Sequence, residues 1–192
     1  MIEVAPGVEG LIFDCDGTLV DSMPIHWECW HGTFAKFGAT CPPEFLDRLK
    51  GVPTHGIIAQ FNEAFGYNFD VEEFTEAKEN LAKEKLVNVK EIEEVTALVY
   101  KYHNKLPMAV ASGGPFETVK LSLDATGLSK YFEVYITADD PVAPKPSPDI
   151  FLEAARRIGV APAKCQVFED ADMGVQAAVD AGMVITDVRK YL

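Results

Sequence analysis

Short apolar runs that alternate with amphipathic stretches dominate the pattern of hydrophobic and polar positions along this chain. Five such runs stand out, at Gly10–Asp14, Pro107–Ser112, Cys165–Glu169, Met183–Val188 and, more weakly, Glu133–Thr137. Runs of this length that are apolar throughout are typical of strands buried on both faces of a parallel sheet. We therefore predict a strand in each of them.

Helical patterns separate the predicted strands, and a glycine follows each pattern. These helices are predicted at Phe116–Thr126, Pro148–Ile158 and Asp172–Ala181. Ser147 is a candidate N-cap of the second helix, because proline suits the first helical position that follows it. Strands that alternate with helices favour an α/β fold, with a Rossmann-like parallel sheet covered by helices on both faces.

One long segment, from about residue 22 to residue 87, breaks this alternation. It contains no convincing strand, and its helical patterns fall at Ile25–Phe37, Glu44–Lys50, His55–Phe65 and Val71–Leu86. A connection of this length is too long for a loop inside a compact domain. We therefore predict a Rossmann-like core of residues 1–21 and 88–192, into which a small α-helical cap of residues 22–87 is inserted.

An acidic motif, DCDG at Asp14–Gly17, stands at the end of the first predicted strand. Ligands of open parallel sheets bind beyond the carboxyl ends of the strands. On an extended chain Asp14 and Asp16 point the same way, so one carboxylate can be a nucleophile and the other an acid or base. A solvated acidic turn is the alternative. A calcium loop of the EF-hand type starts in the same way, but Leu19 and Val20 stand where it needs oxygen ligands.

Residues suited to an anion occur at two later points of the chain. Ser112 and Gly113 follow the second predicted strand, where a hydroxyl and free backbone N–H groups can hold phosphate oxygens. An ordinary strand-to-helix turn is the alternative there. Lys145 lies between two prolines, and this stiffened backbone suits a fixed counter-charge better than a surface lysine. We predict that these three residues bind phosphate.

Two adjacent acids, Glu169 and Asp170, close another predicted strand. They would be costly to bury unless a cation compensated their charge, and oxygen ligands beside a phosphate favour Mg²⁺. Helix N-capping is the alternative, for which Asp172 is the better candidate. Because all these motifs stand at the carboxyl ends of predicted strands, we expect them to converge on one site.

The charge balance limits the choice of partners. The chain carries 30 acidic and 17 basic residues, which gives a formal net charge of −13. Such a surface repels nucleic acid and anionic membranes, and no apolar stretch is long enough to span a bilayer. We expect a small phosphate ester as partner, no nucleic acid, no membrane, and a monomer or weak oligomer.

The cysteines and the N-terminal residues bear on the cellular compartment. The four cysteines are scattered and form no Cys-x-x-Cys pair, which argues against zinc or thioredoxin-like chemistry. Scattered thiols and the absence of a signal-peptide pattern predict a cytoplasmic location.

Four of the motifs together resemble those of the haloacid dehalogenase-like hydrolase superfamily. They are DCDGTLVDS at Asp14–Ser22, ASGG at Ala111–Gly114, KPSPD at Lys145–Asp149 and FEDA at Phe168–Ala171. Their order and spacing agree with that family over nearly the whole chain. The helical insert resembles the cap of the β-phosphoglucomutase-like branch, and within it the chain is most similar to sugar phosphatases of the fructose-1-phosphatase type.

This resemblance implies a Mg²⁺-dependent phosphatase that hydrolyses small phosphate esters, sugar phosphates in particular, through an aspartyl-phosphate. It implies Asp14 as the nucleophile and Asp16 as the acid and base. The magnesium ligands that it implies are Asp14, Asp16 through its backbone carbonyl, Asp170, and Glu169 either directly or as a supporting neighbour. The cap residues that it implies to face the substrate are His26, Arg48 and Lys78, for which a solvated helix face is the alternative.

Three other functions share part of this pattern. A β-phosphoglucomutase would use the same site groups and pass the phosphoryl group between sugar hydroxyls instead of to water. A receiver-type phosphorylation switch also carries strand-end acids and a lysine, but such domains are shorter and have no helical insert. A cysteine phosphatase needs Cys-x5-Arg, which this chain lacks, and strand alternation turns Cys15 away from the site.

Overall fold

The computed structural model describes all residues 1–192, and its centre is one parallel sheet in the order β3-β2-β1-β4-β5. The strands are β1 (Gly10–Phe13), β2 (Met108–Ala111), β3 (Val134–Ile136), β4 (Cys165–Glu169) and β5 (Val184–Asp187). All five predicted strands are therefore present, and the predicted α/β fold class is confirmed.

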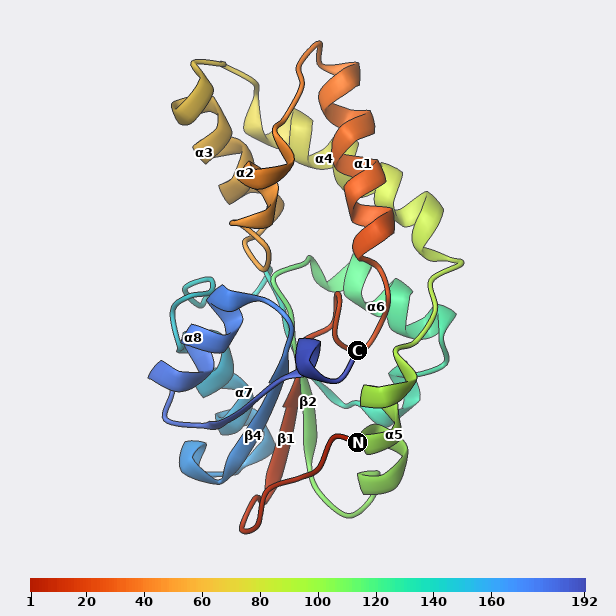
Figure 1. Cartoon of the computed structure of the whole chain (residues 1–192), viewed down its shortest axis with the longest axis vertical. Helices are drawn as coiled ribbons and strands as arrows, with labels where there is room; N and C mark the ends of the chain where they lie inside the picture. The colour runs from red at the N-terminus through yellow and green to blue at the C-terminus, as the bar shows by residue number, and fades with distance from the viewer.

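Helices cover both faces of the sheet, as Figure 1 shows. They are α5 (Glu93–Tyr102), α6 (Phe116–Ala125), α7 (Asp149–Ile158) and α8 (Asp172–Asp180), with short 3-10 helices η1 (Ser129–Tyr131), η2 (Pro162–Lys164) and η3 (Val188–Lys190). Leu11 and Phe13 of β1 pack in a hydrophobic cluster with α5 and α6, whereas Ile12 packs with α7 and α8. The alternation of side chains along one buried strand thus builds two cores.

The sequence patterns differ from the structure at three helices of the core. They single out no helix at α5, because its apolar positions are interspersed with Glu93, Glu94 and Lys101, which lie in its first and last turns. Helix α7 begins one residue later than predicted, so Pro148 and not Ser147 stands at its N-cap position; Ser147 Oγ accepts only the N–H of Asp149, at 3.4 Å. Asp172 does not cap α8 either.

Four helices lie above the carboxyl ends of the strands (Figure 1). They are α1 (Met23–Lys36), α2 (Pro43–Asp47), α3 (Thr54–Phe65) and α4 (Val71–Leu86). Their apolar faces share an aromatic core of their own, in which the Phe34 ring lies 4.5 Å from that of Phe61 and 4.9 Å from that of Phe74. Helix α2 is shorter than predicted because the chain turns before Gly51, whose φ is +85°.

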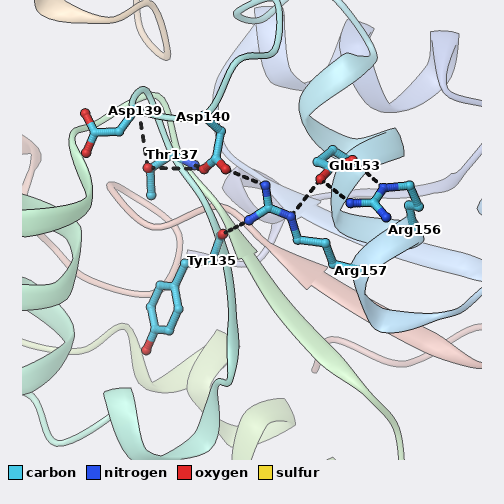
Figure 2. A network of polar contacts seen from close by, with 7 residues as sticks. All are labelled: Tyr135, Thr137, Asp139, Asp140, Glu153, Arg156 and Arg157. Carbon is cyan, nitrogen blue, oxygen red and sulfur yellow. Dashed lines mark hydrogen bonds and ion pairs between the residues drawn. The ribbon is translucent and has the colours of Figure 1, made fainter.

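The outer edge of the sheet at β3 is closed by one arginine, as Figure 2 shows. Arg157 of α7 donates to the carbonyl of Tyr135 at 3.0 Å and to Glu153 at 2.7 Å, and it also pairs with Asp140. Asp140 in turn accepts the N–H of Thr137 at 2.8 Å. This network occupies an edge carbonyl and anchors the loop that leads from β3 to Lys145.

No helix of the structure combines the length and the apolar character that a membrane span requires.

Candidate active site

Asp14 stands directly after β1, where its N–H still pairs with the carbonyl of Phe168 at 3.0 Å. Its carboxylate accepts a hydrogen bond from Lys145 Nζ at 2.7 Å. The same Nζ donates to Glu169 at 2.7 Å and to the carbonyl of Ala111 at 3.2 Å. The Lys145 side chain is fully buried, so the loop after β3 delivers a cation into the space between the ends of β1, β2 and β4.

Glu169 holds this arrangement from the side of β4. One carboxylate oxygen accepts from Lys145, and the other accepts the N–H groups of Asp170 and Ala171 at 3.1 and 2.9 Å. Its carboxyl group lies against the backbone of α8, where a Cβ on Gly174 would come within 2.1 Å of it. Glu169 therefore holds the turn that leads into α8, whose first turn has no side-chain cap.

Three carboxylates crowd together at this point. Asp14, Glu169 and Asp170 each offer an oxygen, and these oxygens lie within 4.8 Å of one another. Burial, followed by the charge of Glu169, raises the pKa of Asp170 to about 6 and raises that of Asp14 well above its usual range. The charges of Asp14 and Glu169 outweigh burial and raise the pKa of Lys145. One lysine leaves negative charge uncompensated, so the site suits a divalent cation.

Asp170 also explains the glycine of the acidic motif. Gly17 has a φ of +84°, which favours glycine, and a Cβ there would lie 2.4 Å from Asp170 Oδ2. Thr18 donates to the same carboxylate at 3.2 Å. The loop after β1 thus wraps closely around Asp170.

Asp16 points away from this cluster into a second polar network. Its Oδ1 accepts from Ser22 Oγ at 2.5 Å and lies 3.1 Å from His26 Nε2, while His26 Nδ1 lies 3.3 Å from Lys78 Nζ. Because an ammonium group only donates, Nδ1 of His26 accepts from Lys78 and Nε2 faces Asp16. Burial opposes the ionisation of Asp16, but His26, Ser22 and Lys78 outweigh it and lower its pKa to about 2.

A cavity between the end of the sheet and helices α1–α4, which together we call the cap, connects the two networks. From the core it is lined by Asp14, Asp16, Glu169, Asp170, Ala171, Thr118 and residues 112–115. From the cap it is lined by Met23, His26, Trp27, Trp30, Leu46, Leu49, Lys50, Gly51, Val52, Thr54, Ile57, Lys78 and Glu79. Acids, two lysines and three hydroxyl groups therefore face one space, and most of the apolar side chains around it come from the cap.

The predicted phosphate-binding turn lies where the cap touches the core. Ser112 is buried and its Oγ accepts the N–H of Gly114 at 3.1 Å. A Cβ on Gly113 would lie 2.3 Å from the carbonyl oxygen of Gly51. Only a glycine at position 113 therefore allows the cap loop to approach this closely.

Most of the residues singled out from the sequence come together. The cavity is lined by Asp14, Asp16, His26, Lys78, Ser112, Gly113, Glu169 and Asp170, and Lys145 binds Asp14 directly. Arg48 does not line it: its side chain is exposed and donates to the carbonyl of Glu44 at 3.3 Å, as the solvated alternative requires. Cys15 is fully buried in the core, as predicted.

Sequence reasoning missed four polar residues of the site. The four are Lys50, Thr54, Glu79 and Thr118, all of which line the cavity. Glu79 accepts hydrogen bonds from both threonines and from the predicted Lys78. Glu79 directly follows a predicted site residue, but on α4 it is one of many charged positions, so the sequence carries no signal that separates it.

Comparison with known proteins gives the family. A model described as haloacid dehalogenase-like hydrolase matches residues 11–188, and the chain belongs to this family. Over 180 residues it is 36% identical to fructose-1-phosphate phosphatase YqaB of Escherichia coli, with 94% of this chain and 96% of that protein covered. The predicted family is therefore confirmed.

Two further similarities agree with this assignment. The chain is 31% identical over 180 residues to a phosphorylated carbohydrates phosphatase of Thermotoga maritima, covering 92% of this chain and 82% of that protein. Its structure resembles the β-phosphoglucomutase of Clostridium difficile with a TM-score of 0.84, 24% identity, and coverage of 93% and 83% of the two chains. At that identity the second comparison establishes the fold alone.

Proposed function

We propose that this protein is a phosphoric monoester hydrolase that acts on sugar phosphates by transferring the phosphoryl group to Asp14 and then to water. The observation that carries the proposal is the contact between the buried Lys145 and Asp14, which stands at the carboxyl end of β1 and lines the cavity. The names of the relatives, which are phosphatases of fructose 1-phosphate and of phosphorylated carbohydrates, support the substrate class.

Asp14 is the proposed nucleophile. One of its oxygens attacks phosphorus while the bond from phosphorus to the ester oxygen breaks, which yields an aspartyl-phosphate and an alcohol. Phosphoryl transfer depends mainly on positioning and on neutralising the phosphoryl oxygens. Lys145, Ser112 and the N–H groups near Gly113 are the proposed partners of those oxygens, and Lys145 also fixes Asp14.

Asp16 is the proposed acid and base. It must hold a proton when the ester oxygen leaves, and it must accept one from the water that cleaves the aspartyl-phosphate. With a pKa of about 2 it is ionised before substrate binds, which suits the second step. The negative charge of a bound phosphate raises its proton affinity and so favours the first step.

The acidic cluster fits a magnesium ion. The carboxylates of Asp14 and Asp170 are the proposed ligands, together with the backbone carbonyl of Asp16, and the raised pKa of Asp170 reflects a charge that a cation would relieve. Both oxygens of Glu169 are already engaged, so we assign it to holding Lys145 and the start of α8. When bound, Mg²⁺ would offset the repulsion between a carboxylate and a phosphate dianion.

The cap, proposed to comprise residues 22–87, excludes bulk water from the reaction and contacts the leaving group. Its separate aromatic core and its position over the strand ends support this division. The polar network of Ser22, His26 and Lys78 reaches Asp16 from this unit, so cap position and the protonation of Asp16 are linked.

Release of phosphate from a panel of sugar phosphates tests the proposal. We expect many turnovers per chain with Mg²⁺, none in excess EDTA, and none for Asp14→Asn at unchanged thermal stability. A mutase would instead convert β-glucose 1-phosphate to glucose 6-phosphate without releasing phosphate. Turnover by Asp14→Asn close to that of the wild type would contradict the assignment of the nucleophile.

A further inference from the structure

Each lysine on the cap side of the cavity already has an acidic partner, and this affects which phosphate esters the cavity can accept. Its apolar members include the rings of Trp27 and Trp30 and the aliphatic side chains of Leu46, Leu49 and Ile57. Two lysines, Lys50 and Lys78, are the only cationic side chains that the cap contributes to the lining. Whether either can receive an anionic substituent of the substrate depends on the partners that it already has.

Lys78 is committed to partners that are part of the protein. It is 4% exposed, and its Nζ lies 3.0 Å from Glu79 Oε1 and 3.3 Å from His26 Nδ1. The Trp30 ring, with its centroid 5.3 Å from Nζ, covers another side of the ammonium group. Its charge is therefore neutralised within the wall of the cavity.

Glu79 is held in place as the counter-charge. Thr54 on α3 donates to its Oε1 at 2.5 Å, and Thr118 on α6 donates to its Oε2 at 3.2 Å. Burial opposes its ionisation, but Lys78 and the hydrogen bond from Thr54 outweigh burial and lower its pKa. In this buried polar network the one lysine, Lys78, is thus paired with Glu79, and Asp16 adds a second carboxylate on the far side of His26.

Lys50 is also paired, although less tightly. Its Nζ lies 2.9 Å from Asp47 and 5.8 Å from the centroid of the Trp27 ring. Its side chain is 36% exposed, so solvent weakens this pair. Lys50 is thus the one lysine of the cap that could exchange its partner for an anionic group of the substrate. A Lys50 variant is therefore needed beside a Glu79 variant.

We propose that the cap selects phosphate monoesters whose leaving group is uncharged, with Glu79 as the residue that sets this specificity. The inference rests on the proposed phosphatase function. A carboxylate or second phosphate on the leaving group would lose water beside Glu79 and Asp16, and both cap lysines that could compensate its charge already have an acidic partner. Hydroxyl groups face no such penalty, and the Trp27 and Trp30 rings offer apolar surface to the sugar carbons.

Two open-chain substrates make the matched comparison. Sorbitol 6-phosphate and 6-phosphogluconate carry the phosphate at the same position and differ only by a hydroxymethyl against a carboxylate group. We expect kcat/KM to favour sorbitol 6-phosphate by at least about tenfold. Glu79→Gln keeps the size of the side chain but removes its charge, and should reduce this ratio several-fold, mainly by improving KM for 6-phosphogluconate.

Glu28→Gln is the matched control. Glu28 also pairs with a lysine of α4, Lys85 at 2.8 Å, but it is outside the cavity lining. It should leave the ratio unchanged. Equal efficiency with both substrates, or a ratio that Glu79→Gln leaves unchanged, would overturn the proposal. A preference for 6-phosphogluconate that Lys50→Met abolishes would overturn it too, and would assign anion binding to Lys50.

Hydrolysis of 4-nitrophenyl phosphate tests the phosphatase function separately from charge selection by Glu79. No hydrolysis of this ester or of either sugar phosphate would overturn the proposed phosphatase function itself. Hydrolysis of the aryl ester together with equal use of the two sugar phosphates would leave that function standing and reject charge selection by Glu79.

Discussion

Gly113→Ala is the substitution that the contact between cap and core makes most informative. The added Cβ would lie 2.3 Å from the carbonyl oxygen of Gly51, whereas ordinary contacts begin near 3.4 Å. The deficit is 3.4 − 2.3 = 1.1 Å; the backbone fixes the position of the Cβ, and the oxygen belongs to the backbone, so no side-chain rotation can relieve it. The loop that carries Lys50 and Gly51 must therefore move away from the phosphate-binding turn by about that distance.

The expected consequence is a loss of activity rather than of folding. A displacement of about 1 Å in a positioned active site can lower the rate by about 100-fold. Since the cap packs around its own aromatic core, its fold should persist, and the thermal midpoint should change far less than kcat/KM. The assay is kcat/KM for a sugar phosphate, with thermal unfolding of the same preparations.

Gly114→Ala is the matched control for this prediction. A Cβ there would meet Val119 Cγ2 at 3.3 Å and Ser112 Oγ at 3.5 Å, both of which belong to side chains. This variant should keep activity of the same order as the wild type. Wild-type activity of Gly113→Ala, or equal losses in the two variants, would refute the role that we give to the contact with Gly51.

Three further predictions concern the buried charges. Lys145→Met should lower the free energy of unfolding by about 3–5 kcal/mol, measured by chemical denaturation without metal, because it leaves Asp14 and Glu169 unpaired. A loss below about 1 kcal/mol would contradict a stabilising role of these buried pairs. Gly174→Ala should lower the thermal midpoint, because the added Cβ would lie 2.1 Å from Glu169 Oε2. Alanine usually stabilises a helix by about 1 kcal/mol over glycine, so a higher midpoint would contradict this contact. Magnesium affinity, measured by calorimetry, should fall as the pH drops below about 6. The pKa of Asp170 is raised to about 6 without metal, so below that pH a proton competes with the ion for this carboxylate. A constant affinity from pH 5 to 8 would contradict the ligand role of Asp170.

The sequence predicted the sheet and the residues at its carboxyl edge best, because the hydrophobic pattern identifies each strand and the parallel arrangement brings the strand ends together. Apolar runs predicted every strand, and acidic residues at strand ends singled out Asp14 and Asp170, because parallel strands bring their carboxyl ends to one edge. Lys145 was singled out by its two flanking prolines, and the structure places it against Asp14. Helix α5 was missed because charged residues at both of its ends obscure its apolar face.

The cap side of the site was predicted less well. His26 and Lys78 line the cavity as expected, but Arg48 follows the short helix α2 and points to solvent, and Lys50 lines the cavity instead. Glu79 is identified only by its contacts with Thr54 of α3 and Thr118 of α6, which belong to distant parts of the chain. Such contacts depend on how helices pack, and no periodicity within one helix reveals them.

Whether Asp14 carries the phosphoryl group during turnover can be measured directly, by acid quenching the working enzyme and determining the masses of its peptides. We expect one phosphoryl group to be added to the peptide that contains Asp14, and no such addition in Asp14→Asn. Rapid turnover with no phosphorylated peptide, or with a phosphoryl group on any other residue, would contradict the role of Asp14 as nucleophile.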